Sequence, residues 1–515
     1  MVLTRNTASA FNKERDDNSC WLVCVFHVLM DNIIPKKHLS RLSIKRYNPT
    51  MRTLIADTIN KVGEEITVEG WVDTKRDHGK LTFIDMRDRS GKVQCVGFQK
   101  MGELTTESVI QIRGTIKERP ERMINQNIVT GKIEIEVNDY TILNKALELP
   151  IQIDTEGKEI NEESRLRYRY IDLRRERMQK IIRLRSRLFH AMREKLIENE
   201  FVDIETPILA KSTMEGARDF LVPSRFQPGK FYALPQSPQQ YKQLLMTAGF
   251  EKYFQFARCF RDEDLRADRG FEFTQLDLEM SFVKREDVMA TIEEVVKYSV
   301  KEVGGKLKSE TFPVIDYKDA MTKYGADKFD LRTEEEKEQN VLAFAWVVNF
   351  PFFKKVDKKD AAEVRDGKSG WTFTHNPFSM PIAEHEDWLL KGEHIDEITT
   401  TQYDLVCNGL EVGGGSIRAH RQELLEATYR IMGYTAEQTQ ASVGHMIEAF
   451  GFGTPPHGGI ALGVDRLVAI LTGESSIKET IAFPTTSTGR TAVMEAPSEV
   501  SKVQLQELGL NVVEK

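Results

Sequence analysis

Residues 253–282 read YFQFARCF-RDEDLRADRG-FEFTQLDLEMSF, two apolar stretches around ten residues rich in arginine and aspartate. Each apolar stretch has the length and aromatic content of a buried β-strand. The charged segment 261–270 is therefore predicted to be the loop of a hairpin. A strand-end arginine followed by carboxylates offers a cation to a phosphate and oxygens to a metal or an amine. Taken alone, such a cluster is more often a solvated loop.

The segments around this hairpin alternate between apolar strands and helices with an apolar face. Strands are predicted at 343–350, 403–412 and 460–463, and helices at 181–196, 286–303, 421–432 and 464–471. Strands joined through hairpins with helices outside them predict an α+β domain built on an antiparallel sheet.

Closer to the N-terminus the pattern changes to five short alternating strands, predicted at 66–72, 81–87, 93–98, 109–116 and 132–137. Five such strands within about 90 residues indicate an OB-fold β-barrel. Arg76, Phe83 and Gln94 lie where such barrels bind single-stranded nucleic acid, and an aromatic beside an arginine can stack an unpaired base. The strand pattern alone leaves open the alternative of a core Phe83 and a solvated Arg76.

Composition excludes several classes of protein. The 515 residues exceed one ordinary domain, and 40% hydrophobic with 29% charged residues is typical of a globular chain. No apolar stretch approaches the roughly 20 residues of a membrane helix. Five scattered cysteines form neither a disulfide framework nor a zinc site, which favours a reducing cytosol. A net charge of −7 does not exclude nucleic acid, because a local basic patch decides that binding.

Two glycine-rich segments add candidate ligand contacts. Residues 411–418 read EVGGGSIR, and residues 459–467 read GIALGVDRL, a strand that enters a helix carrying Arg466 in its first turn. A helix N-terminus with an arginine suits a phosphate, whereas three glycines alone more often form a bulge or a turn. Residues 367–369, GKS, lack the glycine that a P-loop requires five positions earlier, where Ala362 stands.

Together these segments resemble the three motifs of class II aminoacyl-tRNA synthetases. Residues 201–207, FVDIETP, resemble motif 1, the FRDE of the charged loop resembles motif 2, and GVDR resembles motif 3. STMEGARD at 212–219, QSPQQYKQ at 236–243 and GGGSIR narrow the resemblance to the bacterial aspartyl-tRNA synthetase family. The similarity runs from about Met51 to the C-terminus.

The resemblance implies a two-step reaction in which aspartate and ATP give aspartyl-adenylate and pyrophosphate, and aspartate is then transferred to tRNA. Arg261, Glu263 and Arg466 are implied as catalytic residues, with Arg261 bridging the α-carboxylate and the α-phosphate. The implied ATP site consists of Arg261, Asp262, Glu263, Glu411, Gly463, Val464, Asp465 and Arg466. Asp404 and Glu411 are implied as ligands of Mg²⁺, whose preference is for carboxylate oxygens.

The implied aspartate pocket combines anionic and cationic groups. Its residues are Glu215, Ser237, Gln239, Gln240, Tyr241, Lys242, Arg261, Asp277, His375 and Arg418. Asp277, Ser237 and Gln239 would take the ammonium, while Lys242 and Arg418 would take the side-chain carboxylate. Two cations facing one carboxylate would reject neutral asparagine.

The chain departs from the family at four places. The usual bacterial insertion domain between residues 332 and 346 is missing, Gly270 and Phe271 stand where Gln-Pro is common, and Asn376 replaces a second histidine. Residues 1–50 have no family counterpart. The expected domains are this extension, an anticodon-binding barrel at 51–149, a linker at 150–175 and the class II catalytic domain at 176–515.

The resemblance further implies a cytoplasmic homodimer whose partners are aspartate, ATP and tRNA(Asp), and it leaves open whether tRNA(Asn) is also charged. Two other functions stay open. The first is a sister enzyme for asparagine or lysine, which Lys242 and Arg418 disfavour. The second is a catalytically inactive tRNA-binding paralogue, which the intact motif residues disfavour.

Overall fold

The computed structural model describes residues 52–79, 81–213, 215–357 and 368–513. The extension predicted at 1–50 lies outside these ranges. The chain divides into two compact units, 1–148 and 149–515, which are described separately.

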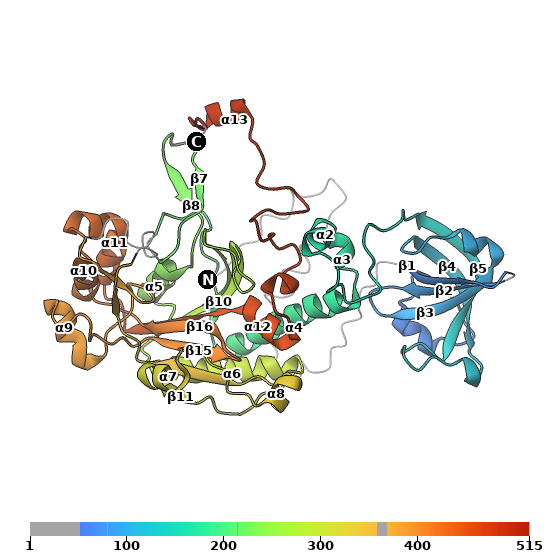
Figure 1. Ribbon diagram of the computed structural model, residues 1–515, viewed down its shortest axis with the longest axis horizontal. Helices are drawn as coiled ribbons and strands as arrows, with labels where there is room; N and C mark the ends of the chain where they lie inside the picture. The colour runs from blue at the N-terminus through green and yellow to red at the C-terminus, as the bar shows by residue number, and fades with distance from the viewer. Residues whose placement is uncertain (1–51, 80, 214, 358–367, 514–515) are drawn as a thin grey trace, which may run out of the picture. The chain divides into compact units, whose positions relative to one another are not determined.

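The first unit is a closed five-stranded barrel in the order β1-β2-β3-β5-β4 (Figure 1). Its strands are β1 (Glu65–Asp77), β2 (Leu81–Arg87), β3 (Lys92–Phe98), β4 (Val109–Glu118) and β5 (Ile133–Asn144). Alternate residues such as Val68, Ile84 and Ile112 point inward and are fully buried, which is the period of two that the sequence shows. The predicted OB-fold barrel is confirmed, with strand limits shifted mainly at the ends of β1 and β5.

The second unit is built on an eight-stranded mixed sheet in the order β11-β12-β15-β16-β17-β10-β9-β6. The strands are β6 (Val202–Asp203), β9 (Lys252–Phe260), β10 (Glu272–Ser281), β11 (Val314–Asp316), β12 (Phe344–Val348), β15 (Tyr403–Cys407), β16 (Leu410–Ile417) and β17 (His457–Gly463). The pairs β11–β12 and β6–β9 are parallel and the other neighbours are antiparallel. The predicted α+β architecture is confirmed, with two parallel pairs at the edges of the sheet.

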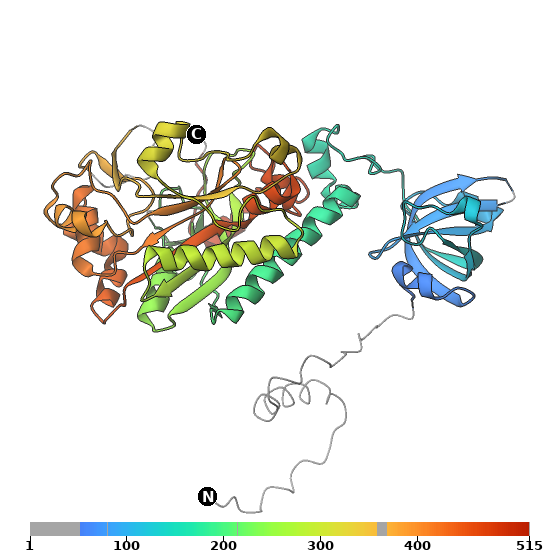
Figure 2. The ribbon, with the colours of Figure 1, turned by 90° about the horizontal axis from the view of Figure 1, so that it is seen from below.

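One face of this sheet is covered by α4 (Glu176–Glu198), α6 (Arg285–Glu302) and α12 (Val464–Thr472), which share its main apolar core (Figure 2). On β10, Leu276, Leu278 and Met280 enter that core. Because side chains alternate along a strand, Asp277 and Glu279 lie on the opposite face. The carboxylates of β10 therefore lie on the face of the sheet away from these three helices.

The prediction of a single strand at 403–412 is wrong, because this segment contains β15, a turn and the beginning of β16. Asn408 and Gly409 separate β15 from β16 and both have positive φ, +52° and +85°. Two such residues make the tight turn that matches strand twist. The pairing then skips Val412, a β-bulge, so that Glu411 comes to the same face of the sheet as Asp404.

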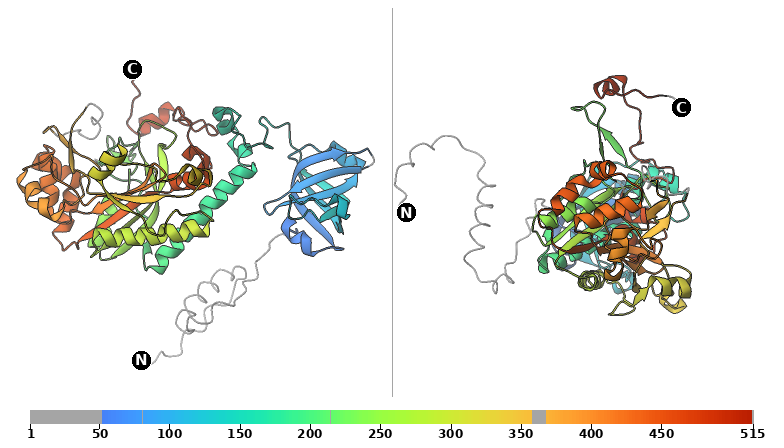
Figure 3. Two further views of the ribbon diagram at one scale, coloured as in Figure 1. Left: turned by 60° about the horizontal axis from the view of Figure 1, so that its bottom comes forward. Right: turned by 90° about the vertical axis from the view of Figure 1, so that its left-hand side faces the viewer.

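The remaining elements pack around the sheet. They are α2 (Glu162–Arg167), α3 (Arg169–Asp172), β7 (Leu221–Pro223), β8 (Phe231–Ala233), α5 (Gln239–Thr247), α7 (Tyr317–Tyr324), α8 (Glu334–Glu338), β13 (Phe353–Lys355), β14 (Trp371–Phe373), α9 (Glu386–Lys391), α10 (Gln422–Ile431), α11 (Ala436–Phe450) and α13 (Lys502–Glu507). Helices α9, α10 and α11 form a second core with β13 and β14. The hairpin β7–β8 and α13 project together from the unit (Figure 3).

The segment predicted as a linker, 150–175, falls within the second unit and contains a buried charge cluster. Asp172 is fully buried and accepts hydrogen bonds from Arg165 (3.0 Å), Arg169 (2.7 Å) and Arg175 (2.7 Å). Burial alone would raise the pKa of Asp172, but the hydrogen bonds from Arg165 and Arg175 outweigh it and lower the pKa. Asp172 thus stays charged and holds three arginines together.

Replacing Asp172 by asparagine should destabilise the second unit by about 3–5 kcal/mol, because three buried cations lose their shared counter-ion. The lowered pKa means that this stabilisation is present above pH 4 and is lost as the pH falls through the folded-state pKa. Urea unfolding of Asp172→Asn at pH 7 and in acid measures both effects. Asp387→Asn, at an exposed ion pair with Lys391, serves as the control and should change stability by less than about 0.5 kcal/mol. Equal losses in both variants would contradict this assignment.

Candidate active site

Lys242 lies at the centre of the polar face. It projects from α5, and its ammonium contacts Asp277 Oδ1 at 2.7 Å, Glu279 Oε2 at 3.1 Å and the Leu278 carbonyl at 3.3 Å. Its side chain is 1% exposed. A lysine this deep in the protein needs such anionic partners to stay charged.

Arg418, at the end of β16, shares Glu279 with Lys242. Its guanidinium contacts Glu279 Oε1 at 3.0 Å, Ser416 Oγ at 2.8 Å and the Gly459 carbonyl at 3.1 Å. The two cations predicted from the sequence are therefore brought together by one buried carboxylate. Sequence reasoning missed Glu279, although its position two residues after Asp277 on a strand places both on one face.

The two carboxylates of this cluster differ in their electrostatics. Burial alone would raise the pKa of Glu279, but Arg418 and Lys242 outweigh it and hold the pKa below its ordinary value. Burial raises the pKa of Asp277 even though Lys242 lies against it. Among the described residues, Asp277 Oδ2 has no hydrogen-bond partner. Asp277 therefore retains an acceptor atom that a donor could satisfy.

A chain of hydrogen bonds continues from α5 to β17. Gln239 donates to Gln243 at 2.9 Å, and the Gln243 amide lies 3.1 Å from His457 Nε2. His457 Nδ1 lies 2.8 Å from the Pro455 carbonyl, so Nδ1 carries the proton and Nε2 accepts. Burial lowers the pKa of His457 to about 4, which keeps the ring neutral.

The predicted pocket residues on and before α5 have different surroundings. The Gln239 amide donates to Gln243. Gln240 Oε1 lies 2.7 Å from His445 Nε2, and the Tyr241 side chain is half-buried. Ser237 donates to Glu215 Oε2 at 2.6 Å. Burial raises the pKa of Glu215 to about 7, although Ser237 and Arg261 favour its charged form.

The charged loop after β9 carries the three residues predicted as motif 2. The Arg261 guanidinium stacks over the Phe273 ring at 5.0 Å and donates to the Gln236 carbonyl at 3.4 Å. Glu263 pairs with Arg269 at 3.3 Å, and the Asp262 amide donates to the Arg218 carbonyl at 3.0 Å. The Phe273 ring supports the plane of the Arg261 guanidinium, which is close enough to Glu215 to favour the charged form of that carboxyl.

Arg466, in the first turn of α12, links the other motif segments. It donates to the Glu411 carbonyl at 2.9 Å and to Asp268 Oδ2 at 3.1 Å. Gly463 is the residue before the helix and Val464 is fully buried. The Asp465 carboxylate contacts Arg185 and accepts from the Thr274 amide at 2.9 Å, so it anchors the helix start to β10.

Asp404 and Glu411 form a pair of carboxylates on adjacent strands. A Cβ added to Gly414 would lie 2.9 Å from Asp404 Oδ1 and 3.6 Å from Glu411 Oε1, so both carboxylates border the same small space. Gln402 donates to Asp404 at 2.7 Å, and His375 Nε2 lies 3.2 Å from Asp404 Oδ2. Burial alone would lower the pKa of His375, but Asp404 raises it.

This donor set fits a magnesium ion that completes its coordination with phosphate oxygens and water. Mg²⁺ is usually bound by one or two carboxylates together with substrate phosphates. Within the described ranges, no three histidine, cysteine, aspartate or glutamate side chains form a metal site by themselves. A pair of carboxylates suits a metal that is shared with a ligand.

In the barrel, the three predicted nucleic-acid contacts lie together on the outer face. Arg76 contacts Asp85 at 3.1 Å and Gln94 Oε1 at 3.4 Å, and Gln94 donates to Glu134 at 2.9 Å. Phe83 is half-buried and meets the His78 ring edge-on at 5.3 Å. Phe83 is thus not a residue of the barrel core, whereas Gln94 is largely buried between its two partners.

A family model described as tRNA synthetases class II (D, K and N) matches residues 161–487, and an OB-fold nucleic acid binding domain matches residues 66–143. The chain belongs to the class II tRNA synthetases. It is accordingly an aminoacyl-tRNA ligase, of a family that uses ATP and typically Mg²⁺.

Curated relatives cover nearly all of this synthetase. The aspartate–tRNA(Asp/Asn) ligase of Corynebacterium jeikeium is 38% identical over 90% of this chain and 98% of its own length. The aspartate–tRNA ligase of Staphylococcus aureus is 37% identical over 88% and 97%. The first alignment spans 590 positions, more than the 515 residues here, so that relative contains residues without a counterpart in this synthetase.

Solved structures share the fold. The asparaginyl-tRNA synthetase of Pyrococcus horikoshii complexed with asparaginyl-adenylate has a TM-score of 0.67 and 22% identity, covering 84% of this chain and 98% of that one. The aspartyl-tRNA synthetase of Entamoeba histolytica has a TM-score of 0.66 and 21% identity, covering 85% and 92%. In the part of this synthetase that the structure describes, no helix is long and apolar enough to cross a membrane.

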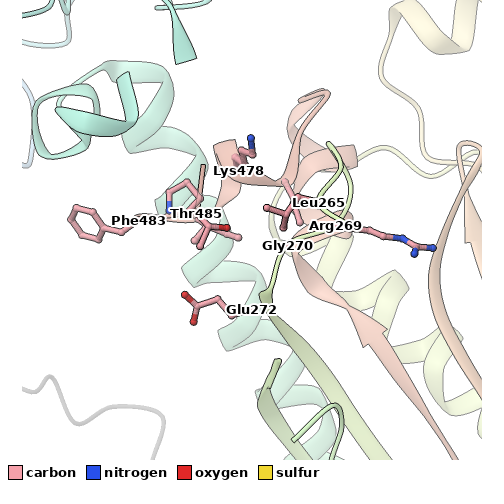
Figure 4. Close-up of a pocket in the computed structure, with 10 residues that line it drawn as sticks. Leu265, Arg269, Gly270, Glu272, Lys478, Phe483 and Thr485 are labelled. Carbon is pink, nitrogen blue, oxygen red and sulfur yellow. The ribbon is translucent and has the colours of Figure 1, made fainter. Parts of the chain in front are cut away.

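A small cavity of about 20 Å³ borders the motif 2 loop of this synthetase (Figure 4). Its lining includes Leu265, Gly270 and Glu272 and, from the segment after α12, Ile477, Lys478, Ile481, Phe483, Pro484 and Thr485. The Arg269 side chain points away from it. Its volume holds about one water molecule. It lies apart from the Lys242–Arg418 cluster and is too small for a substrate.

The Glu215 carboxyl gives a pH-dependent prediction. Because its folded-state pKa is raised from 4.5 to about 7, wild-type stability should fall as the pH rises through this window, when the unfolded chain loses its proton more readily. Glu215→Gln removes this penalty, so its melting temperature should rise relative to wild type between pH 5 and pH 8. The exposed Glu163→Gln serves as the control. A melting-temperature difference that is the same at both pH values would refute the raised pKa.

Proposed function

We propose that this synthetase is an aspartate–tRNA ligase, which activates L-aspartate with ATP and transfers it to tRNA(Asp). The observation that carries the proposal is the buried cluster of Lys242, Arg418, Asp277 and Glu279. The similarity to curated aspartate–tRNA ligases over about nine-tenths of the chain supports it.

The cluster is complementary to the charges of aspartate. Lys242 donates to Asp277 and to the Leu278 carbonyl and forms an ion pair with Glu279. The ammonium and the side-chain carboxylate of aspartate can replace the ion pair between Lys242 and Asp277. In the proposed complex its ammonium pairs with Asp277, and its carboxylate pairs with Lys242 and Arg418. Glu279 keeps its contact with Arg418 and holds that guanidinium in place.

In the proposed first step the α-carboxylate of aspartate attacks the α-phosphorus of ATP. The new O–P bond forms as the bond to pyrophosphate breaks, and Arg261 stabilises charge on the α-phosphate. Glu263 and Arg466 position the two ends of the nucleotide, with Gly463 and Val464 beside it. Asp404 and Glu411 would hold the Mg²⁺ that neutralises phosphate charge. The second step transfers the acyl group to a terminal ribose hydroxyl of tRNA, releasing AMP and the hydroxyl proton.

In the proposed complex with tRNA, Arg76, Phe83 and Gln94 of the barrel contact the anticodon. We further propose a cytoplasmic homodimer. Apolar side chains are exposed around motif 1, where the family resemblance places the dimer interface, at Ile197 (55%), Val202 (43%), Ile208 (49%) and Leu209 (53%). A cluster of exposed apolar side chains favours burial by a partner surface.

The test of the proposed function is ATP–pyrophosphate exchange with aspartate, asparagine and lysine, followed by charging of tRNA(Asp) and tRNA(Asn). Exchange with aspartate alone supports the proposal. Exchange with asparagine or lysine instead would assign a sister enzyme, and no exchange with any amino acid would indicate an inactive tRNA-binding paralogue. Charging of both tRNAs would extend the substrate range to tRNA(Asn), the range stated in the name of the Corynebacterium relative.

Replacing Lys242 by methionine should collapse the preference for aspartate over asparagine. Loss of one partner of a desolvated charge pair costs roughly 2–5 kcal/mol, which lowers kcat/KM for aspartate about 30-fold to several thousandfold in pyrophosphate exchange. Asparagine activity should fall much less, and the KM for ATP should stay near wild type. Lys242→Arg, which keeps the charge, controls for packing. Equal losses with both amino acids in Lys242→Met would remove Lys242 as the group that recognises the side chain.

Gly270 tests the departure from the family at motif 2. A Cβ there would lie 3.4 Å from the Glu272 carbonyl oxygen and 4.0 Å from Ile477, so a side chain fits beside the cavity in Figure 4. Gly270→Gln should lower the KM for ATP by about tenfold or less, the value of one hydrogen bond. Gly270→Ala is the control without the amide. An unchanged KM in Gly270→Gln would mean that this loop contacts ATP differently from the family.

A further inference from the structure

Lys328 lies in the connection between α7 and α8, and neither motif nor pocket reasoning singles it out. Its ammonium contacts Glu411 Oε2 at 2.8 Å. The other oxygen of Glu411 faces the space beside Gly414 that Asp404 also borders. One carboxylate therefore lies between a lysine and the carboxylate pair that fits a metal.

The contact is built into the fold. Phe329, the next residue, is buried in a core with Val347 and Val406 and stacks on Tyr324 at a centroid distance of 4.3 Å. Its carbonyl accepts from the Gly409 amide at 3.0 Å, at the turn of the hairpin β15–β16. Since Glu411 is the second residue of β16, the backbone that carries Lys328 is fixed to the hairpin that carries Glu411.

We propose that Lys328 is the intrinsic counter-ion of Glu411 and competes with a divalent cation for the negative charge of this carboxylate. The inference rests on the proposed function, because it concerns the metal site of the same reaction. The ammonium contacts Oε2 of Glu411, and the space shared with Asp404 is bordered by Oε1. Both cations would therefore bind one carboxylate, and their mutual repulsion makes each weaken the binding of the other. Lys328 thereby weakens the binding of a metal ion in the absence of ATP. When ATP is bound, its phosphates supply additional anionic ligands that favour the metal ion at Glu411 over the Lys328 ammonium.

The test measures Mn²⁺ binding without nucleotide by the loss of the free-ion EPR signal, using the full chain. Lys328→Met should bind Mn²⁺ about tenfold more tightly than wild type at this site, and Lys328→Arg should behave as wild type. The gain should disappear in the double variant Lys328→Met/Glu411→Gln. Lys337→Met is the matched control, because Lys337 is similarly exposed and contacts Glu334 at 2.7 Å on α8.

Melting temperatures of each variant establish that the fold is intact. Unchanged Mn²⁺ affinity in Lys328→Met, or an equal gain in Lys328→Arg or Lys337→Met, would overturn the proposal. Aspartate-dependent pyrophosphate exchange by the wild-type chain is measured in parallel. If exchange occurs and Lys328→Met binds Mn²⁺ as wild type does, only the role of Lys328 fails. If the wild type shows no exchange with aspartate, the proposed function fails independently of the metal measurement.

Discussion

The carboxylate of Glu279 is the interaction on which the site depends. It contacts both Lys242, on α5, and Arg418, directly after β16, which are 176 residues apart in the chain. Two cations brought together inside a protein without such an anion would repel each other and pay a large desolvation penalty. Glu279 lies between them as their shared counter-ion, and both lie where they can reach a ligand carboxylate.

The sheet provides this arrangement through its period of two. On β10 the apolar residues face α4, α6 and α12, so the intervening Asp277 and Glu279 lie on the polar face. On β16 a regular strand would turn Glu411 away from that face. The bulge at Val412 shifts the alternation by one residue, so that one strand places Glu411 beside Asp404 and leads to Arg418 in the Lys242 cluster.

The features that the sequence predicted correctly are those set by the local pattern of polar and apolar residues. The alternation of polar and apolar residues predicts the limits of β2 at 81–87 correctly, whereas the grouping of Lys242, Asp277 and Arg418 in one pocket was implied by the family resemblance. The sequence also carried a signal for the turn at Asn408 and Gly409, because Asn-Gly is typical of a tight hairpin turn, but the segment was interpreted from its apolar residues alone. Lys328 is identified only by its contact with a distant segment, whereas the alternation of β10 already places Glu279 on the same face as Asp277. Similarly, only the packing of α5 shows that the Gln239 amide is directed to Gln243.

The second unit contains two buried ionic clusters, one around Asp172 and one around Lys242. Their hydrogen bonding indicates which cluster stabilises the fold and which is suited to bind a ligand. Around Asp172, both carboxylate oxygens accept from arginines, and those arginines donate further to Glu479 and to backbone carbonyls. Exchange of partners there would leave buried groups unsatisfied, which makes the cluster rigid. Around Lys242, Asp277 Oδ2 lacks a hydrogen-bond partner among the described residues. The ion pair between Lys242 and Asp277 joins two groups that the opposite charges of an amino-acid ligand could each bind instead. A buried ion pair contributes little net stability by itself, so a pair that is complementary to a ligand can be exchanged at small cost. The saturated cluster therefore suits a scaffold, and the unsaturated one suits recognition of an amino acid that carries both charges.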